Sequence, residues 1–173
     1  MIQACALCTD ITNLATLERL IEEVNSLQTK LILLVGSRGK TQLLCALARR
    51  LDGAPLNVGA ELGHRLAATP VSDRGFLTNE LLRGITDDVG GDRPLLLDNL
   101  EVLFEPSLEI NPLNVVRRLA HSRRVVAAWP GEMRNDRLIY ADMGHPEHRD
   151  YTRDGVVFFE SVQSHQGTGR SRI

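Results

Sequence analysis

The residues with the clearest chemical potential are a glycine-containing turn followed by a lysine and a threonine. Gly36 and Gly39 enclose two residues, and Lys40 and Thr41 follow directly. Glycines let a backbone approach phosphate groups, while a lysine ammonium and a hydroxyl contact phosphate oxygens and Mg²⁺. The pattern therefore predicts a phosphate-binding (Walker A) loop. The expected nucleotide-binding residues are Gly36, Ser37, Arg38, Gly39, Lys40, Thr41 and Gln42.

This loop is shorter than the usual pattern, which places four residues between its first glycine and Gly-Lys-Ser/Thr. Only two residues separate Gly36 from Gly39, and Leu34 stands where the first glycine would fall. A shorter loop offers fewer backbone N–H groups to a phosphate, so we expect weak nucleotide binding. The guanidinium group of Arg38 either compensates for the missing N–H groups by binding the phosphate or blocks the space that the phosphate would occupy.

An acidic residue that closes a second apolar run is the expected partner of the loop. Residues 95–97 are all leucine, and Asp98 and Asn99 follow. A carboxylate beside the loop suits Mg²⁺ held through water (a Walker B element), so Thr41 and Asp98 are the expected metal-binding residues. Hydrolases of this class often have a glutamate next, and Asn99 cannot accept a proton. Glu101 can take the place of this glutamate only if the strand ends early. On that condition, the expected catalytic residues are Asp98 and Glu101.

A third apolar run, residues 125–129, predicts a strand beside the second one. Its end usually offers a small polar residue close to the γ-phosphate, but Trp129 and Pro130 stand there. Arg134 or Asn135, in the next turn, lies on the same side of the predicted sheet.

Two arginines precede this third strand and are therefore expected at the opposite edge of the sheet. Arg123 and Arg124 cannot serve their own site from that edge. They are possible arginines in trans for a neighbouring subunit, or solvated charges at a helix C-terminus.

Apolar residues at helical spacing connect these runs and predict an alternation of strands and helices. Helices are expected at residues 11–29, 40–51, 60–68, 77–89 and 111–121, and strands at 31–35, 55–58, 95–97, 125–129, 138–141 and 156–159. Such alternation predicts an α/β fold: a P-loop NTPase-like parallel sheet flanked by helices, in a single domain without a lid domain. We expect an N-terminal extension over 1–10, the domain over 11–160 and a disordered tail over 161–173.

Composition narrows the class of protein further. The 173 residues carry a net charge of −2, which gives no general case for nucleic-acid or membrane binding. No apolar run approaches 18 residues, and three cysteines suit a reducing cytoplasm. Cys5 and Cys8 have C-x-x-C spacing without a second pair, and Gly144-His-Pro-Glu-His148 has no apparent third ligand, so we expect an incidental pair and a turn.

Four segments resemble the BrxF family, the small P-loop proteins of BREX (type 3) bacterial phage-defence systems. They are Leu56–Leu66, Leu97–Leu108 with its Asp-Asn-Leu-Glu-Val-Leu-Phe run, Val125–Gly131 with Ala-Ala-Trp, and Leu138–His148. The resemblance covers roughly residues 15 to 155. Asn99 and Trp129 are also similar to the family pattern.

The resemblance implies a cytoplasmic accessory protein that works beside a larger ATPase, a methyltransferase and an alkaline-phosphatase-like protein. It implies phosphate-loop roles for Lys40, Thr41 and Asp98. We expect Mg²⁺ with ATP or ADP as weakly bound ligands, and a homo- or hetero-oligomer. DNA contact is expected only through the assembly, if at all.

The sequence leaves four candidate functions. The first is a weak nucleotide-binding protein of a defence assembly, with a possible weak ATPase activity. The second is a nucleotide-independent scaffold that recruits or regulates the partner ATPase. A small-molecule kinase has only Asp73 and Arg74 in its favour, and autonomous DNA binding through Arg117-Arg118, Arg123-Arg124 and Arg134 is opposed by the net charge.

Overall fold

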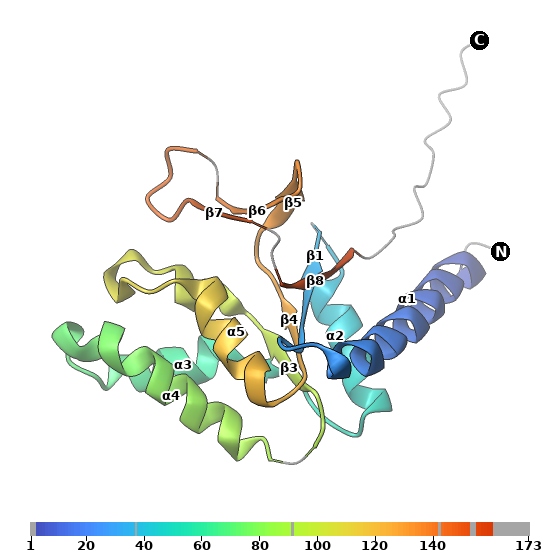
Figure 1. Cartoon of the computed structure of the whole chain (residues 1–173), viewed down its shortest axis with the longest axis horizontal. Helices are drawn as coiled ribbons and strands as arrows, with labels where there is room; N and C mark the ends of the chain where they lie inside the picture. Colours follow the sequence, from blue (N-terminus) through green and yellow to red (C-terminus); the bar gives the residue numbers. More distant parts are fainter. Residues whose placement is uncertain (1–2, 37, 91, 142, 153–154, 161–173) are drawn as a thin grey trace, which may run out of the picture.

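A computed structural model describes residues 3–36, 38–90, 92–141, 143–152 and 155–160, with the backbone alone described for residues 3–11 (Figure 1). The helices are α1 (Gln3–Glu23), α2 (Lys40–Arg50), α3 (Val58–Ala67), α4 (Arg74–Asp88) and α5 (Pro112–Ser122). Short 3-10 helices are η1 (Val24–Ser26), η2 (Val71–Asp73), η3 (Leu100–Phe104) and η4 (Pro106–Leu108). The strands are β1 (Leu31–Val35), β2 (Leu56–Asn57), β3 (Leu95–Asp98), β4 (Val125–Ala128), β5 (Glu132–Arg134), β6 (Arg137–Tyr140), β7 (Arg149–Thr152) and β8 (Val157–Glu160).

Five strands form one parallel sheet in the order β2-β3-β4-β1-β8. This confirms the predicted α/β class with a parallel sheet flanked by helices. Strand β4 lies between β1 and β3, with Ala127 opposite both Leu33 and Leu97. The ends of the second and third apolar runs are therefore neighbours, as the sequence predicts.

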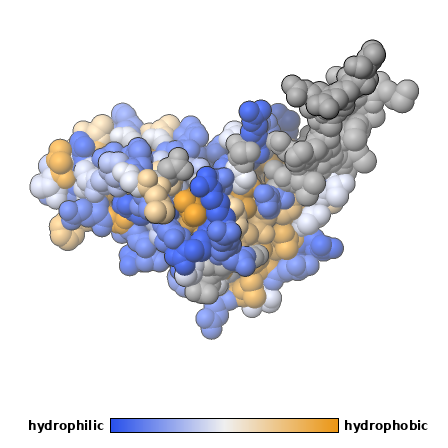
Figure 2. Space-filling view, turned by 90° about the horizontal axis from the view of Figure 1, so that it is seen from above, coloured by the Kyte–Doolittle hydropathy of each residue, from blue (hydrophilic) through white to orange (hydrophobic). Residues whose placement is uncertain are grey.

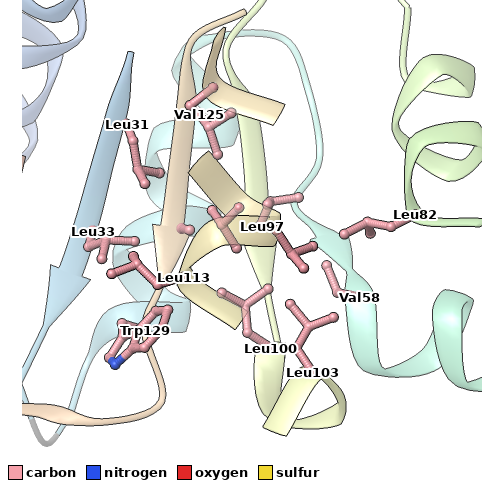
Figure 3. Packing of buried hydrophobic residues seen from close by; sticks show 14 of the residues in the cluster. Leu31, Leu33, Val58, Leu82, Leu97, Leu100, Leu103, Leu113, Val125 and Trp129 are labelled. Atoms are coloured by element: carbon pink, nitrogen blue, oxygen red, sulfur yellow. The ribbon is translucent and has the colours of Figure 1, made fainter. Parts of the chain in front are cut away.

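Helices cover both faces of this sheet (Figures 1 and 3). Leu31 and Leu33 face the side covered by α3, α4 and α5, whereas Ile32 and Leu34 face α1 and α2. Because successive side chains of a strand point to opposite faces, a strand buried on both faces must be apolar throughout. All five residues of β1 are buried, which explains the uninterrupted apolar run.

The predicted start of α5 is confirmed in atomic detail. Pro112 is its first residue, and the Asn111 side chain accepts a hydrogen bond from the Asn114 N–H at 3.0 Å. Asn57 caps α3 in the same way through the Ala60 N–H, also at 3.0 Å.

The first helix differs from its prediction. It begins at Gln3 rather than residue 11, and it ends at Glu23 rather than 29, where η1 follows. Residues 3–10 contain no glycine or proline to stop a helix, so it continues back beyond its predicted start. The predicted tail over 161–173 lies outside the described residues.

A second sheet, antiparallel and in the order β5-β6-β7, joins β4 to β8. It lies beyond the main sheet in Figure 1, on the side where β4 ends. The sequence predicts β6 but misses β5 and β7. Both are short and mix exposed with half-buried positions, so neither shows a clear apolar alternation.

The molecular surface viewed in Figure 2 is mainly hydrophilic, with hydrophobic residues in smaller groups. The large apolar side chains exposed in the described part of the chain are Leu27, Val71, Phe76, Val89 and Met143. Among the described helices none has the length and apolar character needed to cross a membrane.

We predict that Gly131→Ala strongly destabilises the protein. A methyl group at Gly131 would overlap the Ile139 carbonyl, with its carbon 2.8 Å from the carbonyl carbon and 3.0 Å from Trp129 Nε1. Overpacking of this kind costs about 1–3 kcal/mol. Urea unfolding measures it, with Gly63→Ala as the matched control. Nothing lies within 4 Å of a methyl group at Gly63, so that helical substitution should stabilise by up to about 1 kcal/mol. Equal effects of the two variants would contradict the described packing.

Candidate functional site

The start of α2 and the ends of β3 and β4 meet at the carboxyl edge of the sheet. Thr41 Oγ1 donates a hydrogen bond to Asp98 Oδ1 at 3.3 Å, and Lys40 Nζ donates one to the Trp129 carbonyl at 2.5 Å. Parallel strands bring their carboxyl ends to one edge, where open α/β sheets bind ligands. Lys40, Thr41 and Asp98, selected from the sequence by residue type and by their positions after apolar runs, therefore share one site.

The turn between β1 and α2 depends on its two glycines. Gly36 has φ = 117° and Gly39 has φ = 81°, both in the region that side chains with a Cβ rarely adopt. Gly39 precedes Lys40, the first residue of α2. The first N–H groups of a helix have no partner within it and carry a partial positive charge. The start of α2 can thus attract an anion.

The remaining predicted loop residues frame this turn. Arg38, Thr41 and Gln42 are exposed, whereas Lys40 is half-buried. Ser37 lies outside the described residues. Glu160, at the end of β8, reaches the other side of the turn, because a methyl group at Gly36 would lie 4.0 Å from its Cγ.

The chain turns sharply after Asp98 and brings a second carboxylate toward the site. Asp98 is buried, and its Oδ1 also accepts the Asn99 N–H at 3.0 Å. Asn99 has φ = 55°, a left-handed conformation that asparagine tolerates better than most residues. The strand ends at Asp98, η3 begins at Leu100, and Glu101 is exposed on η3.

Electrostatics link the three charged groups. Burial lowers the pKa of Lys40 below 10.5, and the charges of Glu101 and then Asp98 oppose that shift. An ammonium group in partial burial thus faces two carboxylates that favour its charged form. The cluster has one cation and two anions before any ligand is added.

Aromatic packing fixes the carbonyl that Lys40 contacts. The Trp129 ring is fully buried, with its centroid 5.2 Å from that of Phe104 and 5.8 Å from that of Tyr151. The Tyr140 ring packs on Phe104 with the ring centroids 3.8 Å apart, and its hydroxyl donates a hydrogen bond to Glu147 at 3.3 Å. Residue type could not identify Trp129 as part of the site, because its contribution is a backbone carbonyl.

Both candidate arginines in trans make contacts within the chain, at the edge opposite the site. Arg123 Nη1 donates to the Thr86 carbonyl at 2.9 Å. Arg124 Nη1 pairs with Glu22 at 2.9 Å, and its Nη2 donates to the Asp92 carbonyl at 2.8 Å. These contacts provide structural roles for both residues.

The other candidate polar residues lie outside this cluster. Arg134 and Asn135 are exposed, and Arg134 pairs with Glu132 in β5. His145 Nδ1 accepts the Glu147 N–H at 3.2 Å, and His148 Nδ1 lies 2.9 Å from the Ala141 carbonyl. The described residues hold no cluster of three or more His, Cys, Asp or Glu side chains suited to a metal ion.

The donor set fits a phosphate group with Mg²⁺. Mg²⁺ prefers hard oxygen ligands and usually binds one or two protein groups together with substrate phosphates. The Thr41 hydroxyl and the Asp98 carboxylate are such oxygens, already within 3.3 Å of each other. Lys40 and the start of α2 supply the positive charge that a phosphate requires.

Comparisons with protein-family models, curated proteins and solved structures find no match to this chain.

We predict that Lys40→Met changes the environment of Trp129 without any ligand. The substitution removes the 2.5 Å hydrogen bond to the Trp129 carbonyl, and Trp129 is the single tryptophan of the chain. A shift in tryptophan emission at neutral pH, with the fold retained by circular dichroism, measures the effect. Lys30 is the other lysine, at the opposite end of β1, so Lys30→Met is the matched control and should leave the emission unchanged. Identical spectra for wild type and both variants would contradict the contact.

We predict that the buried Tyr151 makes the folded chain less stable against unfolding at alkaline pH. Burial raises its pKa to about 12 from the ordinary value of 10, so the folded chain keeps a proton that the unfolded chain loses between pH 10 and 12. Stability must therefore fall as pH rises through this range. Urea unfolding at pH 8 and pH 11 should show a smaller loss for Tyr151→Phe than for wild type.

Tyr140→Phe is the control at neutral pH. Tyr151 Oη is buried without a hydrogen-bond partner among the described residues, so removing it costs little. Tyr140→Phe loses the bond to Glu147 and should cost about 0.5–1.5 kcal/mol. A larger cost for Tyr151→Phe at pH 8 would show that its hydroxyl is paired.

Proposed function

We propose that this chain is a P-loop-type protein that binds ATP or ADP weakly with Mg²⁺. The observation that carries the proposal is the convergence of Lys40, Thr41 and Asp98 at the carboxyl edge of a parallel sheet, directly after a glycine turn that opens a helix. The strand order further supports it, since β4 separates the loop-bearing strand β1 from the acid-bearing strand β3.

In this proposal each side chain has a defined task. Lys40 and the first N–H groups of α2 bind phosphate oxygens, and Thr41 and Asp98 hold Mg²⁺, which would neutralise phosphate charge. Lys40 must exchange its hydrogen bond with the Trp129 carbonyl for one with a phosphate. That exchange, together with the shortened loop, reduces the affinity.

Turnover is expected to be slow. Asn99 occupies the position directly after Asp98 and cannot accept a proton, whereas the exposed Glu101 can. Glu101 acts on Lys40 electrostatically, which supports its place beside the site. A glutamate on a 3-10 helix one turn beyond the strand is the candidate general base of a weak ATPase.

We further propose that the chain is an accessory protein of a BREX anti-phage defence assembly that works with its larger ATPase. The support is the resemblance of four segments, which make up β2 with α3, β3 with η3 and η4, β4, and β6 with the turn after it. Two of them border the proposed nucleotide site: Leu97–Leu108 holds Asp98 and Glu101, and Val125–Gly131 holds Trp129.

A scaffold that does not need nucleotide is the second candidate. The Lys40–Trp129 hydrogen bond favours it, because it joins the start of α2 to the end of β4 without any ligand. In that case the loop residues serve the fold, and the partner ATPase recognises the surface.

Thermal unfolding with Mg-ATP or Mg-ADP tests the first candidate. Ligand at 100 times Kd adds about 2.7 kcal/mol, which raises Tm by roughly 5–10 °C for a chain of this size. We expect this rise in wild type and Lys30→Met but its loss in Lys40→Met, with Asp98→Asn reducing the Mg²⁺-dependent part.

The absence of a rise at millimolar nucleotide, or an equal rise in Lys40→Met, would exclude nucleotide binding at this site and favour the scaffold. Light scattering with the purified large ATPase then tests the scaffold directly, since it requires a complex that forms equally well without nucleotide.

A further inference from the structure

A cleft separates α4 from α5 on one face of the main sheet, near the edge opposite the proposed nucleotide site. It has a volume of about 600 Å³ and is lined by residues 79–87 of α4, residues 115–122 of α5 and Arg123, which follows α5. Figure 1 shows these two helices side by side. A volume of this size falls within the 300–1,000 Å³ of typical small-molecule sites.

The cleft exists because each helix packs against a different neighbour. Helix α4 packs on α3, where Arg65 Nη2 lies 3.4 Å from Asp88 Oδ2. Helix α5 packs against β1. Leu82 and Val115 are buried and Leu119 is half-buried, so apolar side chains line its deeper part.

The two walls of the cleft differ in charge. The α5 wall offers Arg118, His121 and Arg123 and no acid, whereas the α4 wall offers Arg83 between two acids, Glu80 and Asp87. Without counting histidine, three arginines and two acids leave one positive charge (3 − 2 = +1).

Two of these arginines are available to a ligand. Arg83 and Arg118 are exposed on opposite walls, and neither forms a hydrogen bond or ion pair through its guanidinium group within the described part of the chain. Arg123 differs, because its two terminal nitrogens donate to the carbonyls of Thr86 and Arg93 at 2.9 and 3.4 Å. Its charge is held in place by neutral carbonyls and not cancelled by a carboxylate.

We propose that this cleft binds a small anionic molecule whose carboxylate or phosphate lies between Arg83 and Arg118. The guanidinium fork matches the planar or tetrahedral oxygens of such groups and binds them through two parallel hydrogen bonds. The less polar part of the ligand then contacts Leu119. This site is independent of Lys40, so it stands whether or not the nucleotide proposal does.

Amide NMR of the full chain labelled with ¹⁵N tests the proposal, with citrate and inorganic phosphate as separate probes at constant ionic strength. We expect chemical-shift changes at residues 79–87 and 115–123, and the stronger probe identifies the preferred group. Arg83→Gln with Arg118→Gln should weaken binding by at least tenfold, since the double variant removes both charged hydrogen-bond donors that hold the anion. Glu80→Gln should tighten it severalfold by removing a repelling charge.

Arg19→Gln with Arg49→Gln is the matched control, because it removes the same charge from α1 and α2 on the other face. This variant and Lys40→Met should bind the probes as wild type does. The proposal is overturned if neither probe shifts the cleft amides, if the shifts lie at residues 36–42 instead, or if the control pair weakens binding as much as the cleft pair.

Discussion

Burial of β1, β3 and β4 on both faces is the constraint on which the rest of the structure depends. A strand that is covered on both sides cannot carry polar side chains along its length, so its chemistry is displaced to its ends. Asp98 is the last residue of β3, Trp129 follows the last residue of β4, and Gly36 follows the last residue of β1. Parallel alignment then places these three ends at one edge.

Two hydrogen bonds between chemically different groups hold the resulting site together. A side-chain hydroxyl contacts a buried carboxylate, and a half-buried ammonium contacts a backbone carbonyl. Removing positive charge from water is costly, and two carboxylates and one carbonyl offset that cost for Lys40. The same contacts are those that a phosphate would have to replace in the proposed function.

The appended sheet is more than a connection between β4 and β8. Its tyrosines pack on the aromatic cluster of Phe104 and Trp129, which joins the turn after Asp98 to the end of β4. Close contact of Gly131 with the Ile139 carbonyl fixes where this sheet leaves β4.

The sequence by itself determined the α/β class, the three apolar strands, the start of α5, and the residue types of the site, because each leaves a local signature of periodicity or spacing. It did not determine the start of α1, since the residues before its predicted start carry no signal that stops a helix. It also missed β5 and β7, whose short, partly exposed strands show no alternation. Only the tertiary structure decided that β4 also pairs with β1, that a left-handed Asn99 brings Glu101 toward Lys40, and that a tryptophan carbonyl receives the lysine. Strand order, backbone direction and carbonyl contacts arise from packing between distant segments, and no single segment encodes them.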